Sequence, residues 1–434
     1  ALTPNDTRYN EQWGFFDADA GIRANTAWDV ATGTGIIVAV LDTGQATHSD
    51  ITGNLVAGYD FISNATTAND GGGRDSNPAD PGDWTTGQCG PASGSSWHGT
   101  HVAGTVAART NNGVGVAGTA FNARVMPVRV LGTCGGSTSD IADAIIWSSG
   151  GTVSGVPTLT ASQRAHVINM SLGGGGACGT TTQNAINGAV SRGTTVVVAA
   201  GNDNTNVSQA TPANCSNVIA VASVTSSSAR SSFSNYGTLI DVSAPGSGIL
   251  STLNAGSTTP GAENYASYSG TSMATPHVAG TVALVQSRRL ALGLPLYTPA
   301  EIESLLKSTA YPLAGACSGG CGAGIINARA AVDAAGGGGG TPPPSSQTYA
   351  NETDFAIRDN TTINSPIAVS GRSGNAPSAA SVSVDIAHTY RGDLLVQLIA
   401  PDGTAYTISN RAGGSADNLI GTYTINLSSE PLNG

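Results

Sequence analysis

The chain has 434 residues, of which 39% are hydrophobic and only 10% carry a charged side chain. This length exceeds one ordinary domain and allows a large buried core, and the mean hydropathy of 0.00 argues against wholesale disorder. The net charge of −11 argues against nucleic acid or an anionic membrane as a partner and favours bound cations. No apolar run approaches the roughly 20 residues that a membrane helix needs.

The cysteines and the first residue bear on the cellular compartment. Six cysteines, scattered and without a CxxC pair, favour three disulfides in an oxidising compartment over a metal–thiolate site. The chain begins at Ala1, without Met or a signal peptide. We therefore expect a secreted, extracellular and processed protein.

Five short apolar runs predict strands that are buried on both faces of a parallel sheet. They cover residues 35–44, 123–132, 165–174, 194–202 and 217–224. Between them lie helical patterns at 100–110, 138–149 and 181–193. This alternation predicts a doubly wound α/β fold with a mostly parallel sheet, in which ligands bind beyond the carboxyl ends of the strands.

Two polar residues, Asp42 and His98, lie where a predicted strand ends and just before a predicted helix. Asp42 closes the first strand in VAVLDTG (38–44), where a carboxylate that caps the next turn is the structural alternative. His98 begins HGTHVAG (98–104), and His101 follows at a spacing that a zinc site could also use, although no HExxH pattern is present. We expect His101 to be buried and structural, and His98 to be the exposed histidine.

A third polar residue, Ser272, lies in GTSMATPHVAG (270–280). A lone serine at the start of a helix is usually an N-cap. Together, however, the three segments give the chain order Asp42, His98, Ser272, which is the order of the subtilisin-type triad. In that arrangement the serine attacks a carbonyl, the histidine carries the serine proton to the leaving amine, and the aspartate orients the imidazole.

The chain resembles the subtilisin-like serine proteases from about Asn5 to Ala335, because their three catalytic motifs occur complete and in order. The segments 3–15 and 109–118 look similar to those of thermitase and of secreted Gram-negative members. The resemblance implies a monomeric serine endopeptidase of broad specificity. It would act on proteins and peptides and arise from a zymogen by loss of its own propeptide.

The resemblance also implies the surroundings of the nucleophile. VVVAAGN (196–202) matches the strand whose final Asn202 supplies a side-chain amide to the oxyanion hole, although an ordinary turn asparagine is the alternative. The implied substrate-binding residues are Gly135, Gly136, Ser171, Leu172, Gly173, Gly174, Ala199, Ala200 and Gly201. The first two lie on an edge segment and the others form the S1 walls. Small walls favour a large hydrophobic P1 residue, whereas Asp203 at the rim could attract a basic one.

Calcium is the cofactor that the likeness to thermitase implies. Its implied ligands are three side chains and three carbonyls, those of Asp6, Asp50, Asn112, Arg109, Val114 and Val116. Hard oxygen ligands from a loop suit Ca²⁺. A second acidic cluster, within residues 69–84, consists of Asp70, Asp75, Asp80 and Asp83. It is either a second calcium site, since close carboxylates repel one another without a cation, or a solvated acidic loop.

Six cysteines allow 15 disulfide pairings. We predict Cys89–Cys134, Cys178–Cys215 and Cys317–Cys321. The second bridge would flank the strand that ends at Asn202 and brace the S1 region, and the third would close a Gly-rich turn.

A change of composition divides the chain into two domains. The Gly and Pro runs at 335–346 predict a linker between a catalytic domain, 1–334, and a second domain, 347–434. The second domain alternates apolar and polar residues, which predicts a small all-β, jelly-roll-like fold. Its segment 388–404 resembles the P domain of proprotein convertases, and we expect the domain to be incomplete at its C-terminus.

Two other functions compete with a broad-specificity peptidase. A kexin-like protease that cuts after basic residues is suggested by the P domain, but it needs acidic residues in S1 and S2, where the aligned segments are mostly Gly, Ala and Ser. An inactive binding protein would keep the fold without the chemistry. The intact set Asp42, His98, Ser272 and Asn202 argues against that alternative.

Overall fold

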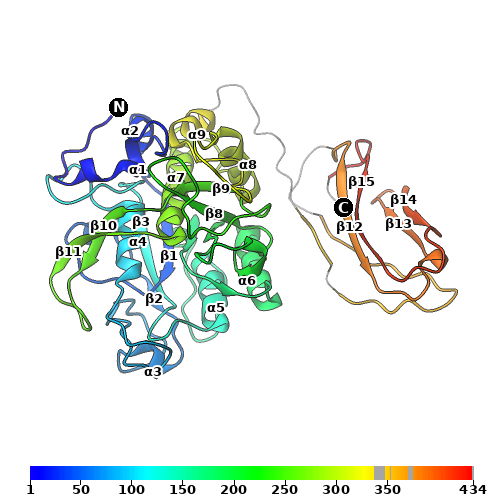
Figure 1. Cartoon of the computed structure of the whole chain (residues 1–434), viewed down its shortest axis with the longest axis horizontal. Helices are drawn as coiled ribbons and strands as arrows, with labels where there is room; N and C mark the ends of the chain where they lie inside the picture. Colours follow the sequence, from blue (N-terminus) through cyan, green and yellow to red (C-terminus); the bar gives the residue numbers. More distant parts are fainter. Residues whose placement is uncertain (337–347, 352, 370–374, 433–434) are drawn as a thin grey trace. The chain divides into compact units, whose positions relative to one another are not determined.

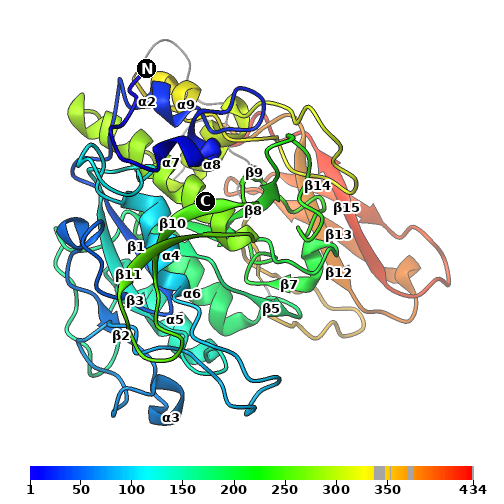
Figure 2. The same cartoon turned by 60° about the vertical axis from the view of Figure 1, so that its left-hand side comes forward.

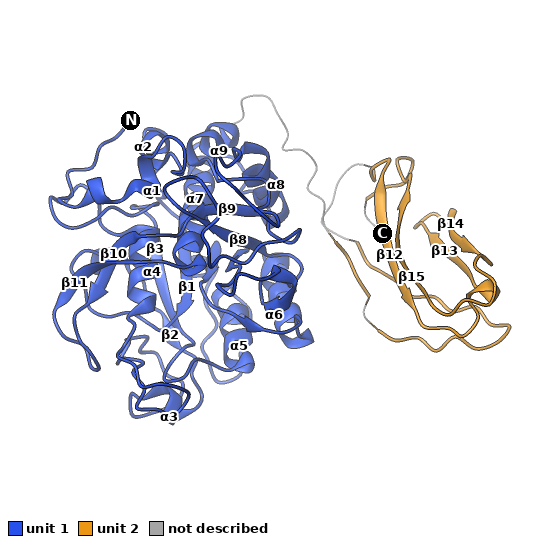
Figure 3. Cartoon of the chain, viewed as in Figure 1, with its two compact units in different colours: residues 1–347 blue, residues 348–434 orange. Residues whose placement is uncertain are grey.

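The computed structural model describes residues 1–336, 348–351, 353–369 and 375–432. It divides into two compact units, residues 1–347 and 348–434 (Figure 3). The expected linker at 335–346 lies outside the described residues from residue 337 onwards.

Unit 1 is built on a seven-stranded sheet in which every pair of neighbouring strands is parallel. Its spatial order is β2 (Tyr59–Asp60), β3 (Arg124–Arg129), β1 (Ile37–Asp42), β4 (Val167–Met170), β6 (Thr195–Ala199), β8 (Ile219–Val224) and β9 (Val242–Pro245). The five expected strands are all present, and the sequence patterns missed only the short β2 and β9. The doubly wound α/β prediction is confirmed.

Helices cover both faces of this sheet (Figures 1 and 2). The longer ones are α4 (His98–Ala107), α5 (Thr138–Ser148), α6 (Thr180–Ser191), α7 (Thr271–Ala291), α8 (Pro299–Thr309) and α9 (Ala328–Ala335). Alternate residues of β1 enter two different cores: Val38 and Val40 join the core around α4 and α7, whereas Ala39 and Leu41 join the core around α5 and α6. An unbroken apolar run therefore buries both faces of the strand.

Shorter elements complete unit 1. They are α1 (Trp13–Phe16), α2 (Ala24–Ala27), α3 (Ala65–Ala68), β5 (Gly174–Gly175), β7 (Ala210–Thr211), β10 (Ile249–Asn254), β11 (Glu263–Tyr268) and the 3₁₀ turns Tyr9–Glu11, Thr52–Asn54 and Val207–Gln209. Antiparallel pairs form between β5 and β7 and between β10 and β11. None of the described helices is long and apolar enough to cross a membrane.

All three predicted disulfides are present: Cys89–Cys134, Cys178–Cys215 and Cys317–Cys321. The second joins the loop after β5 to the loop after β7, so it closes the same pair of chain segments that these two strands join by hydrogen bonds.

Unit 2 consists of short antiparallel strands. β12 (Ala380–Ile386) pairs with β15 (Leu419–Ile425), and β13 (Leu395–Ile399) pairs with β14 (Ala405–Asn410) after the 3₁₀ turn Arg391–Asp393. The alternating residues of β12 and β13 are half-buried and exposed in turn, and the half-buried ones are Ala380 and the expected Val382, Val384, Ile386, Val396 and Leu398. The described part of unit 2 contains no α-helix, which agrees with the all-β prediction.

Candidate active site

Asp42 is the last residue of β1 and its side chain is fully buried. Its carbonyl accepts the N–H groups of Val130 and Leu131, and its Oδ1 accepts the N–H of Thr43 at 2.7 Å. β1 is also the strand at which the chain changes direction across the sheet, since β3 lies on one side of it and β4 on the other. Ligands of open α/β sheets bind beyond the carboxyl ends of strands at such a switch point.

His98 is the first residue of α4 and its side chain is 22% exposed. Its Nδ1 donates to Asp42, at 2.8 Å from Oδ1 and 3.0 Å from Oδ2. Burial alone would lower the pKa of His98, but the charge and hydrogen bond of Asp42, with further charges on Asp83 and Asp80, raise this pKa above its ordinary value. With Nδ1 committed to the carboxylate, Nε2 is the nitrogen left for proton transfer.

Ser272 is the second residue of α7. Its hydroxyl donates to the carbonyl of Ser171 at 3.2 Å, and no hydrogen bond among the described residues joins it to His98. Catalytic hydrogen bonds in substrate-free sites are often long or misaligned, so this geometry does not exclude the pairing. A rotation about the Cα–Cβ bond of Ser272 would redirect the hydroxyl.

Pro276 explains how Ser171 is tied to this helix. Proline has no N–H, so the carbonyl four residues earlier, that of Ser272, loses its helical partner. The Ser171 hydroxyl donates to this carbonyl at 2.8 Å. Ser171 and Ser272 therefore bond each other reciprocally, and the proline in the helix gives the pocket wall a fixed anchor beside the candidate nucleophile.

Asn202 follows β6, and its Oδ1 is held by the N–H of Thr271 at 2.8 Å and the hydroxyl of Thr271 at 2.9 Å. Its Nδ2 lies 3.6 Å from the point that a Cβ on Gly270 would occupy. The amide oxygen is thus fixed by Thr271, the first residue of α7, and the NH₂ group lies near Gly270, beside the place where a tetrahedral oxyanion would form on Ser272. The sequence analysis missed Thr271 as the group that orients Asn202, although it lies within the serine motif.

The expected S1 walls meet at the start of α7. Ser171–Gly174 follows β4, with Ser171 buried and Gly173 and Gly174 exposed. Ala199–Gly201 closes β6, and the N–H of Gly201 binds the hydroxyl of Thr271 at 3.1 Å. By contrast, Gly135 and Gly136 lie in the separate loop between β3 and α5, where Gly136 is exposed. Asp203 is exposed directly after Asn202.

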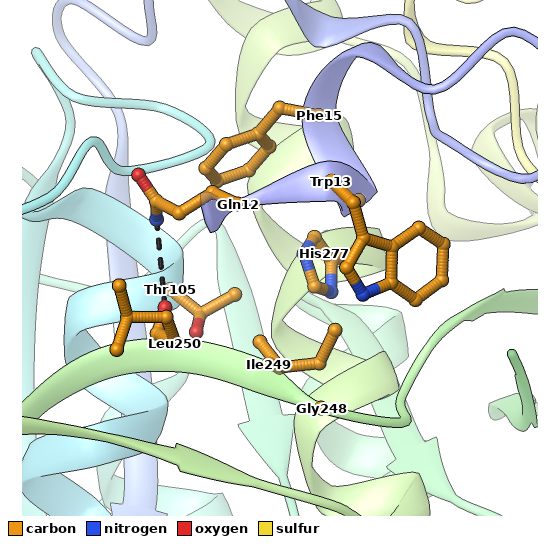
Figure 4. A pocket seen from close by; sticks show the side chains of 9 residues that line it. Gln12, Trp13, Phe15, Thr105, Gly248, Ile249, Leu250 and His277 are labelled. Carbon is orange, nitrogen blue, oxygen red and sulfur yellow. Dashed lines mark hydrogen bonds between the residues drawn. The ribbon is translucent and has the colours of Figure 1, made fainter. Parts of the chain in front are cut away.

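Two other histidines lie close by but are structural. His101 is fully buried, its Nε2 donates to the carbonyl of Ala266 at 2.9 Å, and burial lowers its pKa to about 4. His277 is buried in α7, where burial lowers its pKa to about 4 as well. It lines a small cavity between α7 and the N-terminal segment, together with Trp13 and Phe15 (Figure 4). This cavity includes none of the expected substrate-binding residues.

The first expected calcium site fits a hard cation. Asp6 Oδ1 is buried without a hydrogen-bond partner, and burial together with the charge of Asp50 raises the pKa of Asp6. Asp50 is fully buried and accepts from Asn112 Nδ2 at 2.7 Å and from the N–H of Val116 at 3.1 Å. The loop 109–116 folds over these carboxylates, since the N–H of Arg109 binds the carbonyl of Asp50 and the N–H of Val114 binds Asn112 Oδ1.

The four carboxylates of the second acidic cluster bind different neighbours, which argues against the first of the two alternatives, a shared calcium site. Asp70 reaches Arg129 at 3.2 Å, Asp75 accepts the N–H of Asn77, Asp80 accepts that of Gly82, and Asp83 binds Ser96. No group of three or more His, Cys, Asp or Glu residues that could hold a metal occurs in the described part of the chain. Burial raises the pKa of Asp80 to about 7.

The cation in this region is a buried arginine that the sequence analysis missed. Arg129, at the end of β3, is fully buried. Its guanidinium donates to Asp60 at 2.8 Å, to Asp70 at 3.2 Å and to the carbonyl of Thr43 at 3.2 Å. The apolar run 123–132 contains two arginines: Arg124, near its start, is exposed, whereas Arg129 is buried. The signal was this second charged residue among apolar neighbours. Such a residue needs a buried partner.

Comparisons with known proteins agree with this architecture. Residues 33–339 match the model of the Subtilase family, and residues 377–434 match the proprotein convertase P-domain. An extracellular protease of Xanthomonas campestris pv. campestris is 68% identical over 338 residues, which cover 77% of this chain and 57% of that protein. An extracellular basic protease of Dichelobacter nodosus is 42% identical over 450 residues, covering 99% and 74%.

A solved structure described as proteases from Pseudoalteromonas arctica PAMC 21717 superposes with a TM-score of 0.74 at 56% identity. The match covers 77% of this chain and all of that one. The aligned part spans little more than half of the Xanthomonas protein, so the present chain corresponds to part of that relative's length. The family match covers well over half of the chain, and the chain belongs to the subtilase family of serine proteases, with a P-domain following the subtilase domain.

Proposed function

We propose that this chain is a secreted serine endopeptidase that hydrolyses peptide bonds through an acyl-enzyme on Ser272. The observation that carries this proposal is the Asp42–His98 pair at 2.8 Å, at the carboxyl edge of the sheet to which α7 brings Ser272. The hydroxyl of Ser272 attacks the peptide carbonyl while Nε2 of His98 accepts its proton. The same nitrogen then protonates the leaving amine, and the reverse sequence with water releases the acid.

Asn202 and the start of α7 stabilise the oxyanion. The Nδ2 group of Asn202 and the backbone N–H of Ser272 face the position where negative charge develops, and fixed donors of this kind need no reorganisation during the reaction. Asp42 orients the imidazole and stabilises its charged form. The raised pKa of His98 reflects that stabilisation.

The pocket walls support a preference for large hydrophobic P1 residues. Ser171–Gly174 and Ala199–Gly201 contribute small side chains and no carboxylate, and Asp203 is the one acid directly adjoining them. A kexin-type preference for basic residues needs acids inside S1 and S2, and these walls disfavour it. Gly135 and Gly136 offer backbone groups to extended substrate by strand addition.

Ca²⁺ would be held by Asp6, Asp50 and Asn112 with carbonyls of Arg109, Val114 and Val116. It would neutralise the facing carboxylates and fix the N-terminal segment to the loop after α4. We further propose that the protein acts as a monomer on protein and peptide substrates after removal of its own propeptide. The extracellular names of its relatives support secretion.

A peptide panel with a matched variant tests the proposal. Chromogenic peptides with Phe, Leu, Lys or Arg-Arg before the scissile bond should be cleaved best with Phe or Leu. Ser272→Ala should abolish turnover and labelling by a serine-directed phosphonate while its circular dichroism stays unchanged, although residual catalysis of about 10³- to 10⁴-fold over water can remain. Wild-type labelling of Ser272→Ala would refute the nucleophile, and preferred cleavage after Arg-Arg would favour the kexin-like alternative.

A further inference from the structure

Trp97, the residue directly before His98, has an unusual backbone conformation. Its φ of 51° and ψ of 32° lie in the left-handed region, and its side chain is only 1% exposed. A bulky residue rarely adopts this conformation, which is strained and persists only where the surrounding structure imposes it. Several other positive-φ positions in this chain are asparagines, including Asn69, Asn111 and Asn204, which tolerate the region well.

The side chain of Trp97 is held by the hairpin of β10 and β11. Its indole Nε1 donates to the carbonyl of Gly256, in the loop of that hairpin, at 2.7 Å. The ring forms a small separate core with Ala46 and Leu253, against which Ala266 and Tyr268 pack. Figures 1 and 2 show this hairpin lying against α4. The ring is therefore held by apolar contacts on its faces and by one hydrogen bond, and a change of its rotamer would break both.

The residues just before Trp97 are fixed by the same hairpin. The hydroxyl of Tyr268 donates to the carbonyl of Ser96 at 2.7 Å, and the N–H of Ser95 binds the carbonyl of Ser257 at 2.8 Å. From the other side, Asp83 accepts both the N–H and the hydroxyl of Ser96 at 2.6 Å. The peptide that leads into His98 is thus clamped between the acidic loop and β11.

The hairpin also leads directly into the nucleophile. β11 ends at Tyr268, and Ser272 follows four residues later on α7. The contacts of Trp97 and Tyr268 consequently connect the residue before the candidate base to the strand before the candidate nucleophile. The Trp97 side chain does not cap α4; the N–H of His98 instead binds Ser96 Oγ at 3.3 Å, so the direction of this first residue depends on Ser96 and on the backbone conformation of Trp97.

We propose that Trp97 is a positioning residue, which sets the distance and angle between Nε2 of His98 and Oγ of Ser272. This role rests on the proposed peptidase function. The near-complete burial of Trp97 means that the ring does not contact substrate. Its effect is exerted through the backbone that leads into His98, and it belongs to turnover rather than to substrate binding.

Two substitutions separate the contribution of the indole hydrogen bond from that of the apolar packing of the ring. Trp97→Phe keeps apolar bulk but loses the bond to Gly256. Trp97→Gly permits the left-handed backbone but removes the apolar packing of the ring. Misplacing a catalytic group by about 1 Å costs about 10²-fold in rate, so we expect kcat to fall about tenfold for Trp97→Phe and about a hundredfold for Trp97→Gly, with KM within about twofold of wild type.

Trp147→Phe is the matched control. Trp147 is also buried, its indole donates to the carbonyl of Pro157 at 2.8 Å, and it lies on α5, in the other core. Its loss should reduce the melting temperature about as much as Trp97→Phe but leave kcat unchanged. If both Trp97 variants keep wild-type kcat, or if their losses appear in KM or equally in Trp147→Phe, the positioning role is refuted.

A spectroscopic measurement keeps this test apart from that of the proposed function. The Nδ1 proton of His98 bonded to Asp42 should give a downfield NMR signal that broadens or shifts in Trp97→Phe but not in Trp147→Phe. This readout does not depend on turnover. A wild-type protein without serine-dependent hydrolysis would refute the proposed function, whereas an unchanged His98 signal in both Trp97 variants would refute the positioning role.

Discussion

Two acidic regions of unit 1 were both candidate calcium sites, and they differ in structure. In the first, Asp6 and Asp50 face one loop, one carboxylate oxygen is buried without a partner, and no arginine or lysine forms an ion pair with either residue among the described part of the chain. In the second, residues 69–84, Asp80 Oδ2 is likewise buried without a partner, but the carboxylates turn to different neighbours and Asp70 pairs with Arg129. The number of acids in a segment therefore predicts a cation site less well than whether the fold already supplies a positive charge.

Arg129 supplies that charge in the second region. Its guanidinium is buried between Asp60 and Asp70, while Arg74 pairs with Asp140 and Asp143 at 2.8 Å on the adjoining side. Burial raises the pKa of Asp60 to about 6 even though Arg129 opposes this effect. A metal ion in the first region and Arg129 in the second would thus each supply the positive charge that offsets repulsion between nearby carboxylates.

The largest expected effect comes from removing this arginine. Arg129→Met leaves Asp60 buried without its partner, and breaking a buried pair in this way costs about 3–5 kcal/mol. Urea unfolding should show that loss in the free energy of unfolding. Arg329→Met, which removes an exposed i,i+4 pair with Asp333, is the control and should change little. A loss below about 1 kcal/mol for Arg129→Met would mean that the second region does not depend on its internal cation.

Calcium removal should affect the first region alone. A ligand that binds only the folded state stabilises it by about 2.7 kcal/mol at a hundredfold excess over Kd. Chelation should therefore lower the melting temperature and speed autolysis. In Asp50→Asn most of this dependence should disappear, whereas Asp75→Asn, on the exposed turn of the second region, should keep it. A melting curve that chelator leaves unchanged in the wild type contradicts the calcium proposal.

These contrasts show which features the sequence could predict. Apolar β-branched runs and the three motifs were sufficient for the parallel sheet and for the elements that carry Asp42, His98 and Ser272, because burial on both faces and helix starts leave local patterns. The hydrogen-bond and ion-pair partners of the four acids in residues 69–84 were not predictable. They depend on Arg129 and Ser96, and their pairing arises only when separate elements pack together.

The same reasoning explains why the role of Trp97, and the bond that ties the expected wall residue Ser171 to Ser272, were missed. A tryptophan carries no local signal for a left-handed backbone, and its conformation follows from contacts with Gly256 and Tyr268, more than 150 residues later in the chain. Ser171 resembles any polar residue after a strand. Its bond to the Ser272 carbonyl depends on Pro276 having freed that carbonyl.

The smallest expected effect concerns how the second region acts on the active site. Asp83 raises the pKa of His98 through its charge, after the larger effect of Asp42. Hydrolysis requires neutral His98, and acidification protonates it. The higher the pKa of His98, the higher the pH at which activity is lost. Asp83→Asn removes one negative charge, lowers that pKa and should move the acid limb of kcat/KM to lower pH by a few tenths of a unit, with less shift at high salt. Asp75→Asn is the control, because the exposed Asp75 is not among the main charges that raise the pKa of His98. An acid limb that stays in place, or moves to higher pH, would show that Asp83 serves only to hold Ser96 and that the charges of the second region do not reach the candidate base.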